Sequence, residues 1–181
     1  MATEIKQFNL NQGQRAERKL LVTVAEWEEP LDGTTGTEQV RELLGVRTED
    51  SSIEYNADIQ DSTDILGNNY TDVNKTQPTQ AFDPFLILGG SRLGAFLNDI
   101  RRRNALSELT GAFNIYVITA FVGSSGNYEA EKHDECTITY DSFGGDANVN
   151  FPITVHFSNK ITTGTVDKIK ADFAFMPDVS I

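Results

Sequence analysis

The residues best suited to chemistry lie together at His133-Asp134-Glu135-Cys136. Imidazole, carboxylate and thiolate groups are the usual protein ligands of zinc and related metals. In an extended segment, however, neighbouring side chains point to opposite faces, so His133 and Asp134 would not easily share one ion. No CxxC pair, HxxxH pair or facial-triad spacing occurs elsewhere in the chain. The pattern therefore predicts a turn-to-strand junction and no metal site.

A second group of chemically capable residues consists of the acids Asp58, Asp61 and Asp64. Their density could serve paired-carboxylate catalysis or calcium binding. The calcium-loop pattern D-x-D-x-D-G with a closing Glu is absent, and no feature of the sequence indicates the cleft that carboxylate catalysis needs. These acids are not interpreted as catalytic.

The remaining chemical signals are weak. His156 falls on the polar face of a predicted strand, and two histidines in the whole chain give a nucleophile–base–acid triad little to draw on. The pairs Gly89-Gly90 and Gly144-Gly145 do not match a phosphate-binding loop. The sequence predicts a protein that is not an enzyme and has no cofactor.

Composition indicates one globular domain spanning residues 1–181, with 39% hydrophobic and 23% charged residues. The formal net charge of −12 argues against a nucleic-acid binding site, which needs clustered Lys and Arg to contact phosphates. The single cysteine, Cys136, is predicted to be a small buried hydrophobe. No apolar run approaches the roughly 18 residues that span a bilayer, so no membrane insertion is expected. The N-terminus lacks the features of a signal peptide, which indicates synthesis in a cytoplasm.

Residues 51–80 are predicted to form a long β-hairpin. Along the first arm, Ser51 to Leu66, apolar and polar residues alternate with the period of two that half-buries a strand. The alternating residues are Ile53, Tyr55, Ala57 and Ile59 on one face and Glu54, Asn56, Asp58 and Gln60 on the other. A turn follows at residues 66–69, and the return arm, Asn69 to Gln80, carries few large apolar groups. The hairpin is expected to have one apolar face and one acidic, hydroxyl-rich face.

A helix is predicted at about Ser91 to Leu106, after Gly89-Gly90. Ser91 is a good N-cap, and an apolar stripe at i, i+3, i+4 and i+7 should pack the helix on a sheet. The stripe residues are Leu93, Phe96, Leu97 and Ile100. Arg101 to Arg103 are expected to complement the helix dipole or pair with nearby carboxylates.

Most of the other segments are predicted to be β-strands. Ala112 to Val122 is apolar on both faces, as expected of a strand covered on both sides. Glu28 to Glu42, rich in acidic and turn residues, is predicted to be a long loop. Residues 1–17 are predicted to be an N-terminal arm, either loose or extended. The sum is an antiparallel β-sandwich or barrel of about eight to ten strands with one flanking α-helix.

Two stretches carry a resemblance to a known family. They are RTEDSSIEYN through TQPTQAFDP, within residues 47–84, and FNIYVITAFV at residues 113–122 with the Gly/Asn turn after it. In order and length they resemble the tail tube proteins of tailed bacteriophages, over about residues 43–175. That family has an antiparallel β-sandwich or barrel with one flanking helix, the class expected here from the residue patterns.

The resemblance implies a structural virion protein of the phage tail. Its copies would form rings, usually of six, that stack into a hollow tube through which DNA passes without specific binding. The implied partners are other copies of the chain, a tape measure protein and other tail proteins. By resemblance, the candidate lumen-facing residues are Glu54, Asp58, Asp61 and Asp64, which would repel phosphates. The candidate contact with the next ring is the loop carrying Glu28, Glu29, Asp32, Glu38 and Glu42.

Two other interpretations remain open at this stage. One is a different tail component of similar fold, such as a tail terminator or the inner tube of a contractile particle. The other is a β-sandwich module that binds carbohydrate or a host surface, which would show exposed aromatics on one sheet face. The five tyrosines and single Trp27 are scattered along the chain, which weakens the second interpretation.

Overall fold

The computed structural model describes residues 8–30, 35–48 and 50–178 of the chain. Within them the fold is mainly β, with antiparallel strand pairs and one α-helix, so the predicted fold class is confirmed. The strands are β1 (Leu21–Pro30), β2 (Thr37–Leu43), β3 (Ile53–Glu54), β4 (Asp58–Thr63), β5 (Asn69–Lys75), β6 (Thr79–Phe82), β7 (Phe113–Ser124), β8 (Asn127–Tyr140), β9 (Ile153–His156), β10 (Ile161–Val166) and β11 (Phe175–Pro177). The helix is α1 (Arg92–Arg103), and two 3₁₀ turns are η1 (Arg18–Leu20) and η2 (Leu106–Leu109).

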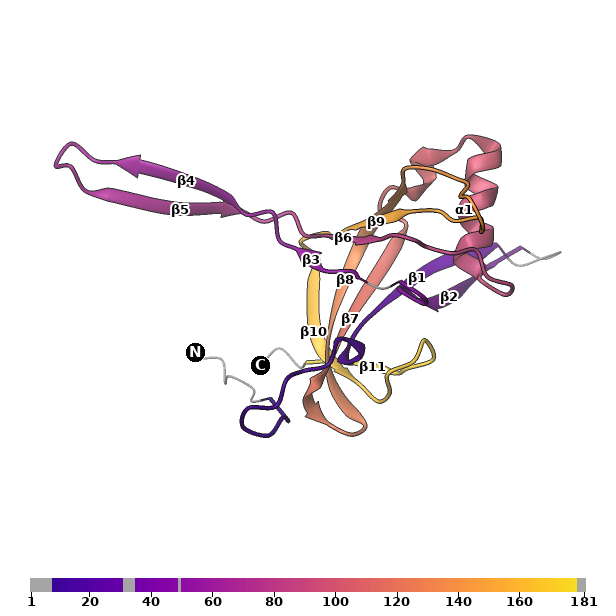
Figure 1. Ribbon diagram of the computed structural model, residues 1–181, viewed down its shortest axis with the longest axis horizontal. Helices are drawn as coiled ribbons and strands as arrows, with labels where there is room; N and C mark the ends of the chain where they lie inside the picture. The colour runs from indigo at the N-terminus through magenta and orange to yellow at the C-terminus, as the bar shows by residue number, and fades with distance from the viewer. Residues whose placement is uncertain (1–7, 31–34, 49, 179–181) are drawn as a thin grey trace.

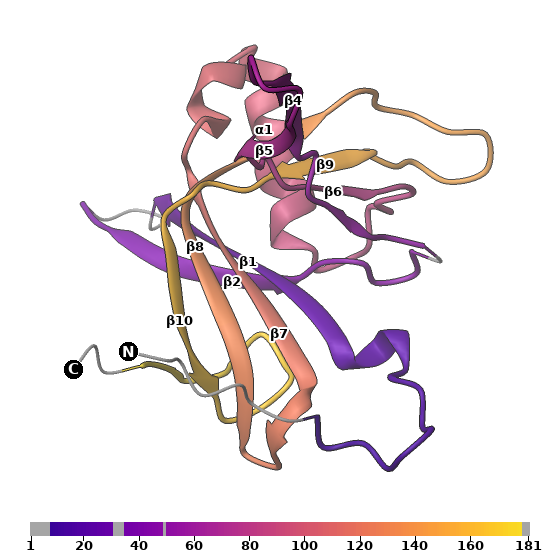
Figure 2. The same ribbon diagram turned by 90° about the vertical axis from the view of Figure 1, so that its left-hand side faces the viewer.

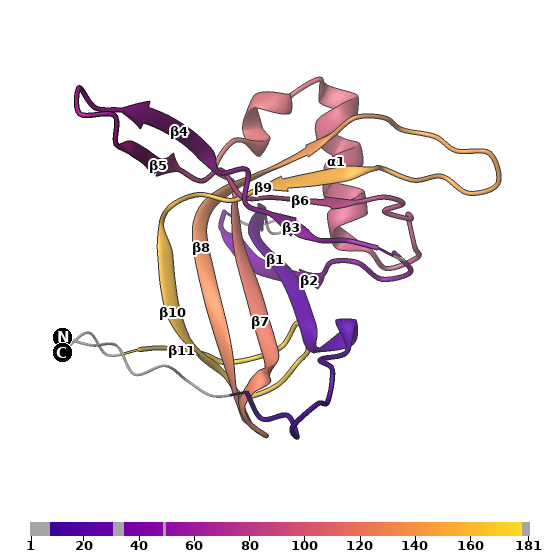
Figure 3. The ribbon, with the colours of Figure 1, turned by 60° about the vertical axis from the view of Figure 1, so that its left-hand side comes forward.

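The long strand β8 connects two parts of the main sheet. Its first half pairs with β10 and its last residues pair with β9, which is followed by β6 and β3 (Figure 3). Between the halves, Phe113 pairs with Cys136 and Ile115 with His133, so β8 contains one extra residue there. Glu135, in this interval, has a φ of 56°. A bulge of this kind bends a strand, which lets β9 and β6 run across β1 and β7 (Figure 2).

Strands β1 and β7 are covered on both faces, as the apolar pattern of residues 112–122 predicts. One face carries Trp27, Phe113 and Ile115, and it packs against α1, β6 and β9. The other face packs against the C-terminal segment; its cluster includes Val24, Tyr116, Ile118, Val166 and Phe173. The two buried faces explain why these strands read as continuous apolar runs.

The helix α1 begins as predicted and ends earlier. The Ser91 hydroxyl accepts a hydrogen bond from the Gly94 amide at 3.0 Å. Asn104 has left-handed backbone angles, with a φ of 54°, and closes the helix after Arg103. Three of the stripe residues, Leu93, Leu97 and Ile100, are fully buried. The fourth, Phe96, is partly buried, and its ring lies 6.1 Å from the rings of both Trp27 and Phe113.

The predicted loop from Glu28 to Glu42 is wrong, because most of this segment is strand. β1 continues to Pro30 and β2 starts at Thr37. Trp27 pairs with Val40 across the two strands, and both side chains are buried. Burial of this pair outweighs the weak strand preference of the acidic residues around it.

Candidate assembly surfaces

The strands β4 and β5 form a separate two-stranded sheet that projects from the body of the molecule (Figure 1). Every residue of both strands is exposed. The predicted hairpin at residues 51–80 is therefore present in two parts. Its root, β3 and β6, belongs to the main sheet, and its outer part, β4 and β5, contacts solvent on both faces.

The root is fastened by Asn56, a residue whose role the sequence analysis missed. Asn56 has a φ of 46°. Its side-chain amide donates to the Gln77 carbonyl and to the Thr79 hydroxyl, both at 3.0 Å. The Gln77 amide donates to the Tyr55 carbonyl at 3.1 Å. The only sequence signal was the residue type, because asparagine tolerates left-handed backbone angles.

The prediction of one apolar and one acidic face is wrong for the outer hairpin. Ile59 lies opposite Val73, and Asp61 lies opposite Thr71. Because side chains two apart share a face, Asp61 is on the same face as Ile59 and Val73. The register also shifts between Asp58 and Ile59. Since a bulge interrupts the alternation of faces, the acids of this hairpin do not gather on one side.

The four candidate lumen residues are accordingly distributed along the whole hairpin. Glu54 lies in β3 at the root, opposite Thr79, and Asp58 begins β4 opposite Lys75. Asp61 lies in the middle of β4, and its carboxylate accepts a hydrogen bond from Thr71 at 2.7 Å. Asp64 is in the turn. Their orientation toward a lumen stays a prediction.

Asp64 organises the turn at the end of the hairpin. Its carboxylate accepts hydrogen bonds from the backbone amides of Leu66 at 2.8 Å and Asn68 at 2.9 Å. It also accepts from the Asn68 side chain at 2.9 Å and the Tyr70 hydroxyl at 3.1 Å. The Asn68 side-chain bond, followed by the Asn68 backbone bond, lowers the pKa of Asp64 to about 2.

This pKa gives a testable pH dependence. Because the folded pKa is depressed, the turn's stabilisation by Asp64 is present above the ordinary carboxyl pKa of 3.8 and is lost as pH falls through about 2. In NMR spectra of unassembled protein, the amide shifts of Leu66 and Asn68 should titrate with a midpoint near 2. Asp64→Asn should remove that titration. A midpoint near 4 in the unmodified protein would contradict the assigned hydrogen bonds.

The tip of the hairpin exposes two large aliphatic side chains. Ile65 is 102% exposed and Leu66 is 81% exposed, the highest values among the large hydrophobic residues that the structure describes. An aliphatic pair at the end of a projecting arm marks an interaction site better than a scattered surface residue does. The outer hairpin therefore offers both free strand edges and an apolar tip.

The acids predicted to contact a next ring have partners within the chain. The Glu42 carboxylate accepts from the Ser91 hydroxyl at 2.7 Å and from the backbone amides of Arg92 and Leu93 at 2.8 and 2.9 Å. Glu42 thus satisfies the first amides of α1 and complements its dipole. No local sequence pattern connects Glu42 to the helix that begins about 50 residues later.

Arg92 also joins the two strands of the β1–β2 hairpin. It forms ion pairs with Glu29, at 2.6 Å, and with Glu38. Glu28 accepts a hydrogen bond from the Thr37 hydroxyl at 3.2 Å. The fifth predicted residue, Asp32, lies outside the described residues. Strand β2 is nevertheless at one end of the main sheet and β3 at the other, so both present an outer edge.

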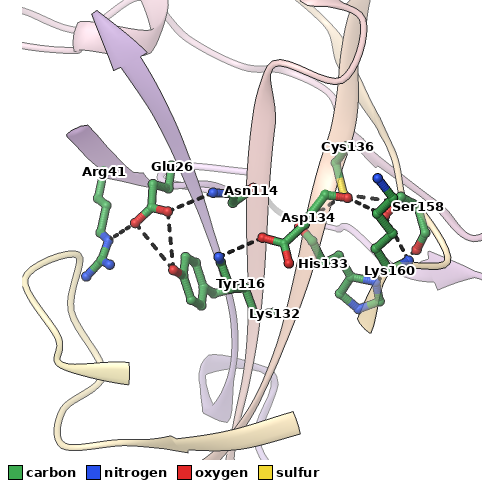
Figure 4. Close-up of polar contacts among 10 residues, drawn as sticks. All are labelled: Glu26, Arg41, Asn114, Tyr116, Lys132, His133, Asp134, Cys136, Ser158 and Lys160. Carbon is green, nitrogen blue, oxygen red and sulfur yellow. Dashed lines mark hydrogen bonds and ion pairs between the residues drawn. The ribbon is translucent and has the colours of Figure 1, made fainter. Parts of the chain in front are cut away.

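A buried polar cluster attaches β2 to the body (Figure 4). Glu26 is 2% exposed. Its carboxylate accepts hydrogen bonds from the Arg41 guanidinium at 2.5 Å, the Asn114 side-chain amide at 2.9 Å and the Tyr116 hydroxyl at 3.3 Å. Arg41 also donates to the Phe173 carbonyl at 2.7 Å. Burial, followed by the charge of Glu26, raises the pKa of Tyr116 to about 12. These groups satisfy one another, and their arrangement is structural.

Residues 133–136 lie inside β8, at its bulge, so the predicted turn-to-strand junction is wrong: the strand continues in pairing with β7 on both sides of the bulge. Lys132 pairs with Asp134 at 2.6 Å, and the Cys136 thiol donates to the His133 carbonyl at 3.4 Å (Figure 4). Cys136 is buried as predicted, and desolvation raises the pKa of its thiol. Within the described part of the chain, no group of three or more His, Cys, Asp or Glu side chains could hold a metal ion.

The N-terminal arm is described only from Phe8 onward. Phe8 forms an isolated β-bridge with Val122, and its ring lies 5.6 Å from that of Phe121. Asn9 donates its backbone amide to the Phe121 carbonyl at 3.0 Å. Residues 11–17 are exposed and form no strand or helix. No helix of the described ranges is long and apolar enough to span a membrane.

These features define an antiparallel β protein with an exposed two-stranded arm. No protein-family model and no curated protein matches the chain. Among solved structures it is similar to the tube terminating cap of the anti-feeding prophage, determined by cryo-electron microscopy. The identity is 14%, the alignment covers 87% of this chain and 95% of that chain, and the TM-score is 0.44. A likeness at this level does not assign a function to the present chain.

Proposed function

We propose that this chain is a structural subunit of a bacteriophage tail that assembles with itself into rings, which stack into a hollow tube. The observation that carries the proposal is the β4–β5 hairpin, which is exposed on both faces, forms a sheet of its own and projects from the body beyond its root (Figure 1). An isolated two-stranded hairpin is marginally stable in water, and its edges have unpaired backbone groups. Such an arm is best explained by neighbours that pair with it.

Pairing between copies would follow from the geometry of the edges. A hairpin that adds to the hairpin of the next copy uses two different edges, which makes the contact heterologous. Heterologous contacts close into a ring when the rotation permits it. The resemblance of residues 47–84 to tail tube proteins supports the same arrangement, with a ring of six as the expected number.

The acidic side chains fit a passage for DNA better than a binding site for it. The net charge is −12, and Glu54, Asp58 and Asp61 are exposed along the hairpin. Screening limits repulsion to about 8–10 Å at moderate salt, so acids act on DNA only where they line the wall. In this proposal the chain is part of the virion tail, and its partners are other copies, a tape measure protein and further tail proteins.

Negative-stain electron microscopy of the purified protein tests the proposal. Rings or tubes with a central hole are expected as concentration rises. Closed rings that never stack would instead favour a tail terminator over a tube subunit. A protein that stays monomeric at high concentration in every salt condition would contradict self-assembly altogether.

A further inference from the structure

A groove runs beside the root of the hairpin, between η1, β3, β7, β8 and β10. Its volume is about 520 Å³, within the range of about 300–1,000 Å³ that is typical of ligand pockets. Its apolar lining includes Leu21, Ile53, Pro78, Val117, Phe157 and Ile161. Val117 and Phe157 are almost fully buried, whereas Ile161 is 53% exposed and forms part of the rim.

We propose that this groove receives the hairpin tip, Ile65 and Leu66, of a second copy of the chain. The inference deepens the proposed self-assembly, on which it rests, by naming the surface that each copy offers to the arm of another. Each subunit would then give one tip and receive one tip.

The occupant has to be another copy because the hairpin cannot reach the groove beside its own root. The groove is lined by residues from both arms of the hairpin, namely Ile53, Tyr55, Thr76 and Pro78. The seven residues of β5 span about 20 Å at the usual strand rise. The outer hairpin extends away from the body over that length (Figure 1). Folding back would break the β4–β5 ladder.

The chemistry of the tip matches the chemistry of the groove. Ile65 and Leu66 are the most exposed large hydrophobics described, and the groove supplies an apolar floor of comparable character. Next to the pair, the Asp64 carboxylate carries a negative charge and is held in place by the hydrogen bonds of its turn. The groove lining includes the guanidinium of Arg18, an opposite charge, which also donates to the Ser51 carbonyl at 2.8 Å, and the acid Glu131 lies beside His133 at 3.5 Å. An apolar contact beside an ion pair would fix the orientation of the tip.

Because tip and groove are different surfaces, the contact is head-to-tail. Such contacts propagate from copy to copy, either around a ring or from one ring to the next. The tip contact adds to strand pairing between hairpins. Substitutions at the tip would remove the tip contact and leave the strand pairing intact.

Disulfide trapping tests the contact on the full-length chain. Two variants, Ile65→Cys and Ile161→Cys, keep the native buried Cys136 and are mixed under assembly conditions with a mild thiol oxidant. We expect cross-linked dimers in the mixture, at least about tenfold more than with either variant alone. The matched control uses Leu106→Cys in place of Ile161→Cys. Leu106 is 52% exposed and is not among the residues that line the groove. Cross-linking of Leu106→Cys to the same extent would overturn the assignment.

The outcomes separate this inference from the proposed function. Rings or tubes without the specific cross-link would overturn the groove and leave the tail proposal standing. Absence of any association would overturn both. As a second measurement, Ile65→Asp with Leu66→Asp should raise the protein concentration needed for assembly by about a hundredfold, at tenfold for each buried aliphatic side chain. An unchanged assembly concentration would count against the docking contact.

Discussion

Replacement of residues 58–75 by a two-residue Asn-Gly turn is expected to abolish ring and tube formation while leaving the body folded. Neither hydrophobic cluster contains a residue of this segment, so its removal exposes no core. The root would stay closed, because Asn56 and Gln77 keep their hydrogen bonds and an Asn-Gly pair suits a tight hairpin turn. The free energy of unfolding should change by no more than about 1 kcal/mol, as for changes away from packed features.

Analytical ultracentrifugation measures whether assembly is lost, and circular dichroism measures whether the body stays folded. The control variant, Gln60→Ser with Ser62→Thr, keeps the hairpin backbone and alters exposed polar side chains only. It should assemble as the parent protein does, since backbone pairing and the tip would carry the contact. If the shortened chain still formed rings, the hairpin would not be the assembly element and the proposed function would lose its basis.

The parts of the fold that were predicted correctly are those specified by local patterns. The period-two alternation around Ile53 and the Gly/Asn turn located the long hairpin, and the stripe at Leu93, Phe96, Leu97 and Ile100 located the helix. The apolar run at residues 112–122 correctly indicated a strand covered on both faces. In each case the buried positions recur at a fixed short spacing along the chain, and apolar residues occupy them.

The parts that were missed depend on contacts between distant residues or on irregular backbone. The β1–β2 pairing was not predicted because its acids are neutralised by Arg92, more than 50 residues further along the chain. The distribution of the hairpin acids was not predicted because a register shift at Asp58 has no clear sequence signature. The groove beside the hairpin root could not be foreseen either, since its lining comes from segments between Arg18 and Ile161.

Arg41→Met is expected to lower the free energy of unfolding by about 3 kcal/mol, the largest stability effect that we predict for a single surface-proximal residue. Its partner Glu26 is buried, so the variant would leave a carboxylate in the interior with only Asn114 and Tyr116 as donors. Breaking a buried ion pair typically costs about 3–5 kcal/mol. The 26% exposure of the Arg41 side chain places the value at the lower end of that range. The loss of the bond to the Phe173 carbonyl adds to the effect.

A double-mutant cycle separates the coupling free energy of the Glu26–Arg41 ion pair from the contributions of the surrounding groups. Glu26→Gln should cost less than Arg41→Met, because the amide still offers an acceptor and Arg41 can turn toward solvent. The double variant should be more stable than additivity predicts, by about 1–3 kcal/mol of coupling. Urea unfolding followed by the fluorescence of the single Trp27 measures all three in the shortened, unassembled background. Lys168→Met, which removes the exposed pair with Asp172, is the matched control and should cost under about 1 kcal/mol. Strict additivity of the two single variants would show that Arg41 holds β2 through packing over Tyr116 and Phe173, and not through the charge of Glu26.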